Sequence, residues 1–250
     1  MSFLYNTIVY NPLYNGLIFL MDVLPWADAG VAIVIFTIIV KLLLFPLSKK
    51  AVTTQLKMKK IEPELSELKT KYKDDKQAHA MKTMEIYKKN GVNPFASIIL
   101  ILIQLPIIFA LYKVFMSGFS NINPDILYSF VRVPEIINTH FLGLIDITGK
   151  NIILAILAGV SSFIQIKYSM PVAPKVPAKN VENMTKEERF KHDLTRTMGT
   201  QMRYTLPVLA FVISWTVSGA IAIYWITSNI FTIAQELVIR RSVAKENGVK

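Results

Sequence analysis

Five long apolar runs, separated by polar segments, dominate the pattern of hydrophobic and polar positions. A helix needs roughly 20 mostly apolar residues to cross the hydrocarbon core of a bilayer. The runs are Gly30–Leu47, Pro94–Met116, Ile152–Tyr168, Tyr204–Val217 and Ala220–Ile239, of which the fourth is short. Because only two residues separate the last two runs, we expect those helices to form a tight antiparallel pair. The pattern predicts an all-α integral membrane protein with five transmembrane helices.

The basic residues orient these helices. Residues 49–94 carry 12 of the 28 Lys and Arg residues, residues 167–203 carry eight, residues 240–250 carry four, and residues 1–30 carry none. Cytoplasmic loops are enriched in Lys and Arg. We therefore expect the N-terminus outside and the C-terminus in the cytoplasm.

This orientation divides the chain into nine segments. The expected boundaries are 1–29 for an N-terminal interfacial segment, 30–48 for the first transmembrane helix, 49–93 for a cytoplasmic helical hairpin, 94–117 for the second transmembrane helix, 118–150 for an outer loop, 151–168 for the third transmembrane helix, 169–203 for a cytoplasmic loop, 204–239 for the fourth and fifth transmembrane helices, and 240–250 for a short basic tail.

The first 25 residues are apolar but interrupted by polar residues. Asn11 and Pro12 are typical of a helix start, with Asn as the N-cap and Pro at the first helical position. Apolar residues then fall on one helix face, with Asn15 and Asp22 off it. We expect an amphipathic helix that lies in the outer interface. A sixth span is an alternative that charge counting leaves open, because it would move no later loop.

The long basic segment after the first run has its own helical periodicity. Apolar residues repeat at helical spacing in two stretches: Ile61, Leu65, Leu68 and Tyr72, then Met81, Met84 and Tyr87. A polar turn, Lys73–Lys76, lies between them. The pattern predicts a cytoplasmic helical hairpin of roughly 50–72 and 76–90.

Lys41 is a charged residue within a predicted span, and such a residue is a functional candidate by default. It lies about 10 Å from the inner end of the first span, at about 1.5 Å per residue. Polar side chains of the same or other spans reach the inner half of the bilayer too: Thr37, Gln104, Gln165, Ser228, Asn229 and Gln235. Agreement in depth favours a shared hydrated cavity open to the inside.

Two simpler interpretations stay open for these residues. The long Lys41 side chain could extend along the span and place its ammonium at the inner interface. Gln104 and Asn229 could each hold two helices together through a hydrogen bond.

Small residues and prolines predict how the spans pack. Ala155 with Gly159, and Ala158 with Ser162, have the small-xxx-small spacing that allows close contact between helices. Prolines at 46, 106 and 207 lie in or at the ends of spans, where we expect kinks.

Composition narrows the classes of function. Hydrophobic residues make up 52% of the chain and charged residues 18%, which is typical of a membrane protein rather than a soluble one. The absence of cysteine excludes disulfides and thiolate metal sites. The three histidines lie in three different loops, and we find no catalytic residues, metal site, nucleotide loop or cofactor site. We attribute the net charge of +11 to basic inner loops rather than to nucleic-acid binding.

The ordered motifs resemble the YidC/Oxa-type membrane protein insertases. The resemblance runs from about Asn11 to Arg241 and is carried by Thr37–Leu47, Gly91–Pro94, Ile103–Tyr112 and Tyr224–Phe231, followed by Gln235. It implies a five-helix core around a hydrophilic groove, open to the cytoplasm and to lipid. It also implies that newly made client segments leave along the second and fourth spans and that the cytoplasmic hairpin assists capture.

Four departures from the family pattern affect this expectation. Lys41 stands where the family usually has arginine, so a point charge replaces a bidentate fork. The turn before Tyr224 lacks the proline often found there, and residues 1–29 leave no room for the large outer domain of some members. The tail is too short to support the ribosome docking of long-tailed relatives.

We therefore expect a multi-pass insertase of the bacterial plasma membrane that acts without covalent chemistry. Its expected partners are nascent membrane-protein clients and the lipid bilayer, with a general secretion channel and the ribosome as further candidates. A small transporter or channel that uses Lys41 as an anion site is the alternative. A structural assembly factor that only packs client helices is a second one.

Overall fold

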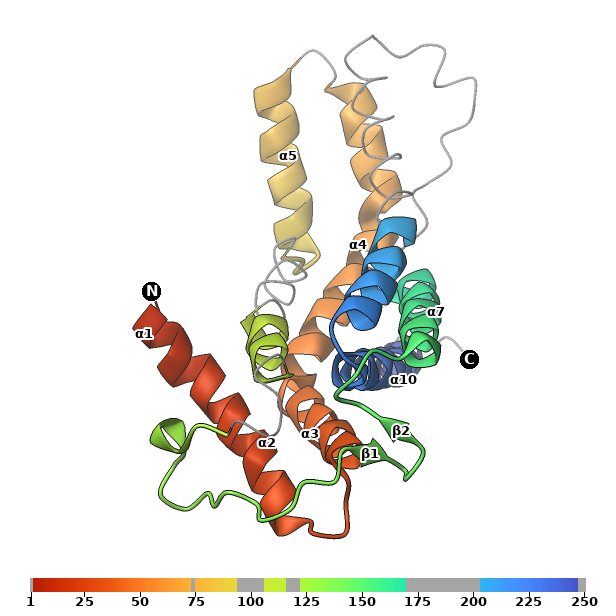
Figure 1. The fold of residues 1–250 in the computed structure, drawn as a ribbon. Helices are drawn as coiled ribbons and strands as arrows, with labels where there is room; N and C mark the ends of the chain where they lie inside the picture. The colour runs from red at the N-terminus through yellow and green to blue at the C-terminus, as the bar shows by residue number, and fades with distance from the viewer. Residues whose placement is uncertain (1, 73–74, 94–105, 116–121, 170–202, 247–250) are drawn as a thin grey trace.

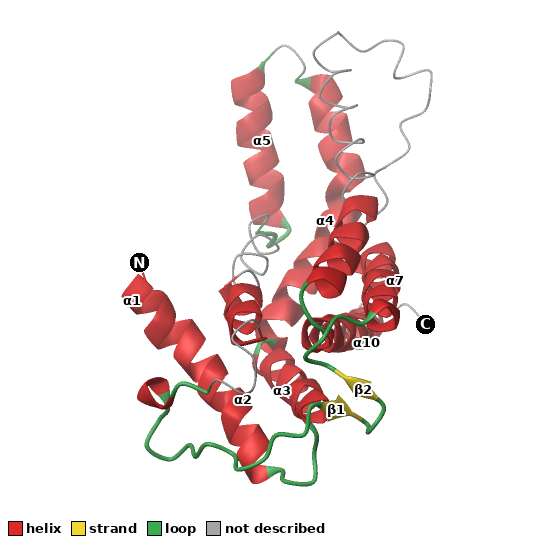
Figure 2. Cartoon of the chain, viewed as in Figure 1, coloured by secondary structure: helices red, strands yellow, loops and turns green. Residues whose placement is uncertain are grey.

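The computed structural model describes residues 2–72, 75–93, 106–115, 122–169 and 203–246. These residues are mostly helical, with one short pair of strands among them (Figure 2). The elements in chain order are α1 (Ser2–Tyr5), the π-helix η1 (Asn6–Tyr10), α2 (Asn11–Val23), α3 (Ala29–Leu43), α4 (Phe45–Lys71), α5 (Lys76–Lys89), the 3-10 helix η2 (Pro124–Ile126), β1 (His140–Phe141), β2 (Ile145–Asp146), α7 (Ile152–Ser169) and α10 (Gly219–Glu246). Residues 106–115 and 203–216 are also helical.

Two of these helices, α7 and α10, are long and apolar enough to cross a membrane, and the bent pair α3–α4 is a third candidate. Helix α7 coincides with the third predicted span, and α10 begins one residue before the fifth. Residues 203–216 are helical where the fourth span is predicted, whereas residues 94–105 of the second lie outside the described residues. The count of five spans stays a prediction.

The first predicted span ends earlier than the sequence suggested. Helix α3 ends at Leu43, and α4 leaves it at an angle of 61°. Pro46 lies in the first turn of α4. Because the first N–H groups of a helix have no partner within the helix, the missing N–H of proline leaves no bond unmade there, and Pro46 suits the start of a new helix. The predicted kink therefore lies at Leu44, and the apolar residues that follow belong to a new helix.

The N-terminal helix differs from the prediction at two residues. Tyr10 and Asn11 both have right-handed helical dihedrals, so α1, η1 and α2 follow one another without a break, and Asn11 does not cap a helix start. Asn15 is only 2% exposed instead of lying off the packed face. Its amide donates to the Ile126 carbonyl, and its oxygen accepts from the Tyr128 N–H. The later loop covers this polar side chain, which the local pattern could not show.

The main core lies where α3, α7 and α10 meet residues 107–115 and the N-terminal helix. Small residues let these helices approach closely. A Cβ on Gly159 would lie 3.1 Å from the Phe211 Cβ, so α7 contacts the 203–216 helix there. Ala158 and Ser162 are buried on α7 as well. The close contact predicted for the third span is present.

The segment around β1 and β2 packs against the first residues of both α3 and α10, at the side of the molecule where these helices begin (Figure 1). Asp28 caps α3 through the Val31 N–H and also accepts from the Leu142 N–H. On α10, the Ala220 N–H donates to the Ile147 carbonyl. Ile147 is fully buried, so the β1–β2 segment is tied to both helices.

Helices α4 and α5 lie side by side and extend away from the rest of the chain (Figure 1). They share a small cluster of buried residues formed by Ile61, Ile86 and Val92. Asp75 caps α5 by accepting from the N–H groups of Gln77 and Ala78. Most residues of this predicted segment are thus helical, and the cytoplasmic hairpin itself stays a prediction.

Candidate functional site

Lys41 lies in the last turn of α3, just before the bend into α4. Its ammonium donates to the Thr232 hydroxyl of α10 at 3.3 Å, across 191 residues of sequence. The Thr232 hydroxyl in turn donates to the Ser228 carbonyl at 2.7 Å. Thr232 therefore accepts from Lys41 while its own proton is used within α10. This contact directs the Lys41 side chain across the interface between the two helices.

Three further candidates lie close to this contact in sequence or on the same helix face. Thr37, one turn before Lys41, is 1% exposed and donates to the Ile33 carbonyl at 2.6 Å. On α10, Ser228 and Gln235 are buried and share a face with Thr232, because residues three and four apart are neighbours on a helix. The structure thus groups Lys41 with one polar face of α10.

Asn229 has its partners on α7 instead. Its amide donates to the Ser161 and Ser162 hydroxyls at 3.0 and 2.8 Å. These bonds join α10 to α7, which is the interhelical role that the sequence left open for Asn229.

Gln165 also belongs to the interface between α7 and α10. Its amide donates to the Ser169 hydroxyl at 2.9 Å, and that hydroxyl donates to the Glu236 carboxylate. The other Glu236 oxygen accepts from Arg240 Nη2 at 2.6 Å and Nε at 3.1 Å. Arg240 Nη2 also donates to the Tyr168 carbonyl at the end of α7. A connected polar network therefore lies beside the Lys41 contact.

This arrangement of polar side chains within apolar helices can be compared with known proteins. Residues 20–246 match the family described as 60Kd inner membrane protein.

The chain belongs to that family.

Its relatives include proteins named membrane protein insertase YidC from three bacteria. The protein from Fusobacterium nucleatum is 31% identical over 238 residues, which cover 94% of this chain and 98% of the relative. The one from Oceanobacillus iheyensis is 33% identical over 85% of this chain and 74% of its own length. The one from Clostridium tetani is 28% identical over 90% and 88%. The resemblance to YidC/Oxa-type insertases is confirmed.

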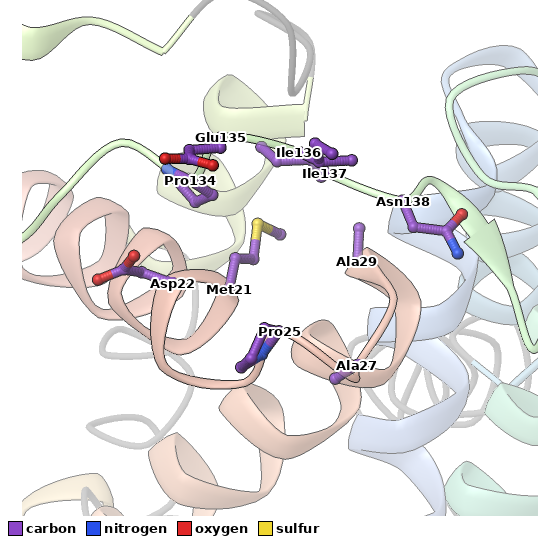
Figure 3. Close-up of a pocket in the computed structure, with 10 residues that line it drawn as sticks. All are labelled: Met21, Asp22, Pro25, Ala27, Ala29, Pro134, Glu135, Ile136, Ile137 and Asn138. Atoms are coloured by element: carbon purple, nitrogen blue, oxygen red, sulfur yellow. The ribbon is translucent and has the colours of Figure 1, made fainter.

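Family membership does not by itself locate a groove. The structure has a cavity of about 420 Å³ between the end of α2, the turn before α3 and residues 134–138 (Figure 3). A second one, of about 370 Å³, lies between α4 and α5. Lys41 lines neither of them, and Gln104 lies outside the described residues. A groove around Lys41 stays a prediction.

Sequence reasoning missed three charged residues within the predicted spans. Glu236 lies inside Ala220–Ile239, Lys113 lies near the end of Pro94–Met116, and Lys167 lies at the end of Ile152–Tyr168. The test that singled out Lys41 would have found all three. The Lys113 ammonium lies 4.5 Å from the centre of the Tyr10 ring, which is the geometry of a cation–π contact. Thr232 was missed too, although it is four residues from Ser228.

The acidic and histidine side chains make no metal centre in the part of the chain that the structure describes. No group of three or more His, Asp or Glu side chains there could hold a metal ion. The site consists of one ammonium, hydroxyls, amides and the Glu236–Arg240 ion pair, of which the carboxylate is buried.

Proposed function

We propose that the protein is a membrane protein insertase that helps newly synthesised hydrophobic segments enter the membrane and fold there. Membership of the 60Kd inner membrane protein family and relatives named membrane protein insertase YidC support this function. The observation that carries the proposal within the structure is the contact between Lys41 and Thr232. It directs a positive charge across the interface of two apolar helices.

The physical task of such a protein is to lower the barrier for polar groups that cross the bilayer. A charged side chain at the centre of a helix costs about 2.5–3.5 kcal/mol on insertion scales. An ammonium about 4 Å from a carboxylate contributes about 4 kcal/mol at an effective dielectric constant of about 20. Lys41 can therefore offset most of that barrier for one acidic residue of a client, and no enzymatic step is needed.

The groove is proposed to open towards the cytoplasm and lipid and to contain Lys41, Thr37, Gln104, Gln165, Ser228, Asn229 and Gln235. Lys41, Ser228 and Gln235 would present polar groups to the client. Asn229 donates to Ser161 of α7, and Gln165 donates to Ser169 within α7. These two amides would hold the wall of the groove.

The proposed topology is five spans in the bacterial plasma membrane, with the N-terminus outside and the C-terminus in the cytoplasm. The basic loops support it. The β1–β2 loop lies at the beginning of α3 and the α4–α5 hairpin follows its end, so this topology puts the loop outside and the hairpin inside (Figure 1). Nascent clients and lipid are the proposed partners, beside which a general secretion channel and the ribosome stay candidates.

The test is insertion of a small single-span protein into liposomes that contain the purified chain. We expect insertion by the native protein, retention in Lys41→Arg and a loss of at least about tenfold in Lys41→Ala, because water in the groove screens part of the charge interaction. Thr232→Val keeps the shape of the side chain but removes the acceptor for Lys41, so an intermediate loss is expected. Lys150→Ala removes an exposed lysine from the predicted outer loop, and it serves as the matched control.

Two results would contradict parts of this proposal. Equal activity of all Lys41 variants would leave the proposed insertase function intact and would show that Lys41 has no part in its mechanism. Absence of insertion by the folded native protein, together with flux of a small anion, would favour the transporter.

A further inference from the structure

A buried carboxylate lies one helical turn from the residue that receives Lys41. Glu236 is 3% exposed and follows Thr232 by four residues on α10. Side chains at that spacing are neighbours, about 5–6 Å apart at their Cβ atoms. Because the Lys41 ammonium donates to Thr232, the charges of Lys41 and Glu236 act on the same region of the interface.

Arg240 neutralises this carboxylate. Two of its guanidinium nitrogens donate to one Glu236 oxygen, at 2.6 and 3.1 Å, while Ser169 donates to the other oxygen. The Arg240 side chain is 40% exposed and that of Glu236 only 4%. A buried carboxylate whose partner is removed keeps its charge at a large penalty, or takes up a proton. The net charge near Lys41 therefore depends on Arg240.

We infer that the Glu236–Arg240 pair determines which clients the protein inserts, by preserving the positive charge that Lys41 presents to acidic segments. The inference rests on the proposed insertase function. With Arg240 present, the three side chains carry one net positive charge, and a client carboxylate is attracted. Without Arg240, a Glu236 carboxylate that stays ionised with Ser169 as its remaining donor cancels the charge of Lys41, and acidic segments lose their advantage over neutral ones.

The size of the effect follows from the separation of the charges. A client carboxylate that contacts the Lys41 ammonium would lie about 8 Å from Glu236. This distance adds the length of a hydrogen bond to the spacing of about one helical turn between Thr232 and Glu236. At an effective dielectric constant of about 20, a unit charge at that distance changes affinity about thirtyfold. Water in a groove screens the interaction, so we expect a change of about fivefold in selectivity.

A purely structural role of the pair would act differently. Arg240 also donates to the Tyr168 carbonyl, so it joins the ends of α7 and α10. Loss of this connection would reduce the insertion of every client by the same factor. Only the electrostatic role predicts a change in the ratio between acidic and neutral clients, which makes that ratio the decisive quantity.

The experiment compares two single-span clients in proteoliposomes that contain the full-length chain. The clients differ only in their translocated flank, which carries two Asp residues in one and two Asn residues in the other. In Arg240→Gln, we expect the ratio of acidic to neutral insertion to fall about fivefold, with neutral insertion within twofold of native. The double variant Glu236→Gln with Arg240→Gln should restore the ratio, because no uncompensated carboxylate remains.

Arg241→Gln is the matched control, because it removes the same charge from the next, exposed position of α10. It should leave the ratio unchanged. The melting temperature of each variant shows whether it is folded. An unchanged ratio in folded Arg240→Gln would overturn the inference, as would equal losses for both clients in the single and double variants. Failure of the native chain to insert the neutral client would instead refute the proposed function.

Discussion

Asp28→Ala tests whether the loop before α7 is held to the beginning of α3 by one carboxylate. Asp28 is 9% exposed and accepts from the N–H groups of Val31 and Leu142, both at 2.9 Å. The first bond caps α3, and the second reaches a residue 114 positions later. Alanine removes both, and it leaves two backbone donors without these acceptors.

The expected loss of stability is the sum of two contributions. Replacing an N-cap Asp by Ala costs about 1 kcal/mol. Loss of a hydrogen bond to a charged group costs about 1.5–3 kcal/mol. We therefore expect the free energy of unfolding to fall by about 2.5–4 kcal/mol. For a chain of this size, 1 kcal/mol shifts the melting temperature by about 2–4 °C, which gives a decrease of about 5–16 °C.

The assay is thermal unfolding of the protein in detergent, followed by hydrogen exchange of the Leu142 amide. Asp28→Ser should keep the cap and lose the bond to Leu142, so it should fall between native and Asp28→Ala. Asp125→Ala removes an exposed carboxylate from the same connecting segment and should change stability by less than about 0.5 kcal/mol. If Asp28→Ala were no less stable than Asp125→Ala, or if Leu142 exchanged at its native rate, the reasoning would be refuted.

Three other substitutions test the packing and the electrostatics of the fold by the same unfolding assay. Gly159→Val places atoms against Phe211, where even a Cβ would lie at 3.1 Å, and should lower the free energy of unfolding by about 1–3 kcal/mol. The control Gly149→Ala should be nearly neutral, because a Cβ there would meet nothing within 4 Å. Asn15→Leu removes the partners of the Ile126 carbonyl and the Tyr128 N–H and should lower the free energy of unfolding by about 2–5 kcal/mol. A loss below about 1 kcal/mol would show that water replaces the two lost hydrogen bonds. The pKa of Asp146 lies below its ordinary value because the Thr148 N–H and hydroxyl donate to the carboxylate, so this stabilisation is present above about pH 4 and is lost at lower pH. Asp146→Asn should therefore lower the melting temperature slightly at pH 7, and this difference should shrink as the pH falls below about 4. A difference that does not shrink with falling pH would contradict this assignment.

The sequence by itself determined where most described helices lie. Helix α7 occupies Ile152–Ser169 against a predicted Ile152–Tyr168, and α10 begins at Gly219 against a predicted Ala220. Length and apolarity of a run are local properties, and a bilayer-spanning helix satisfies its backbone hydrogen bonds within the run itself. For the same reason, motifs in order along the chain were enough to indicate the family.

The position of polar side chains around each helix depended on the tertiary structure. Lys41 was found from the sequence, but its partner Thr232 is 191 residues away. Asn229 was expected from the sequence in the same inner half of the bilayer as Lys41, yet it bonds to α7. Depth along a helix follows from counting residues, whereas the neighbour that a side chain meets depends on how the helices pack.

The same reason explains the N-terminal helix and the buried ion pair. Asn15 is polar by its sequence context and buried only because residues 126–128 supply its partners. Glu236 has an ordinary apolar neighbourhood in sequence, and only the packing of α7 on α10 brings Ser169 to its carboxylate. A polar group inside a membrane protein is stable only with a partner, and here the sequence supplied the group while the fold supplied the partner.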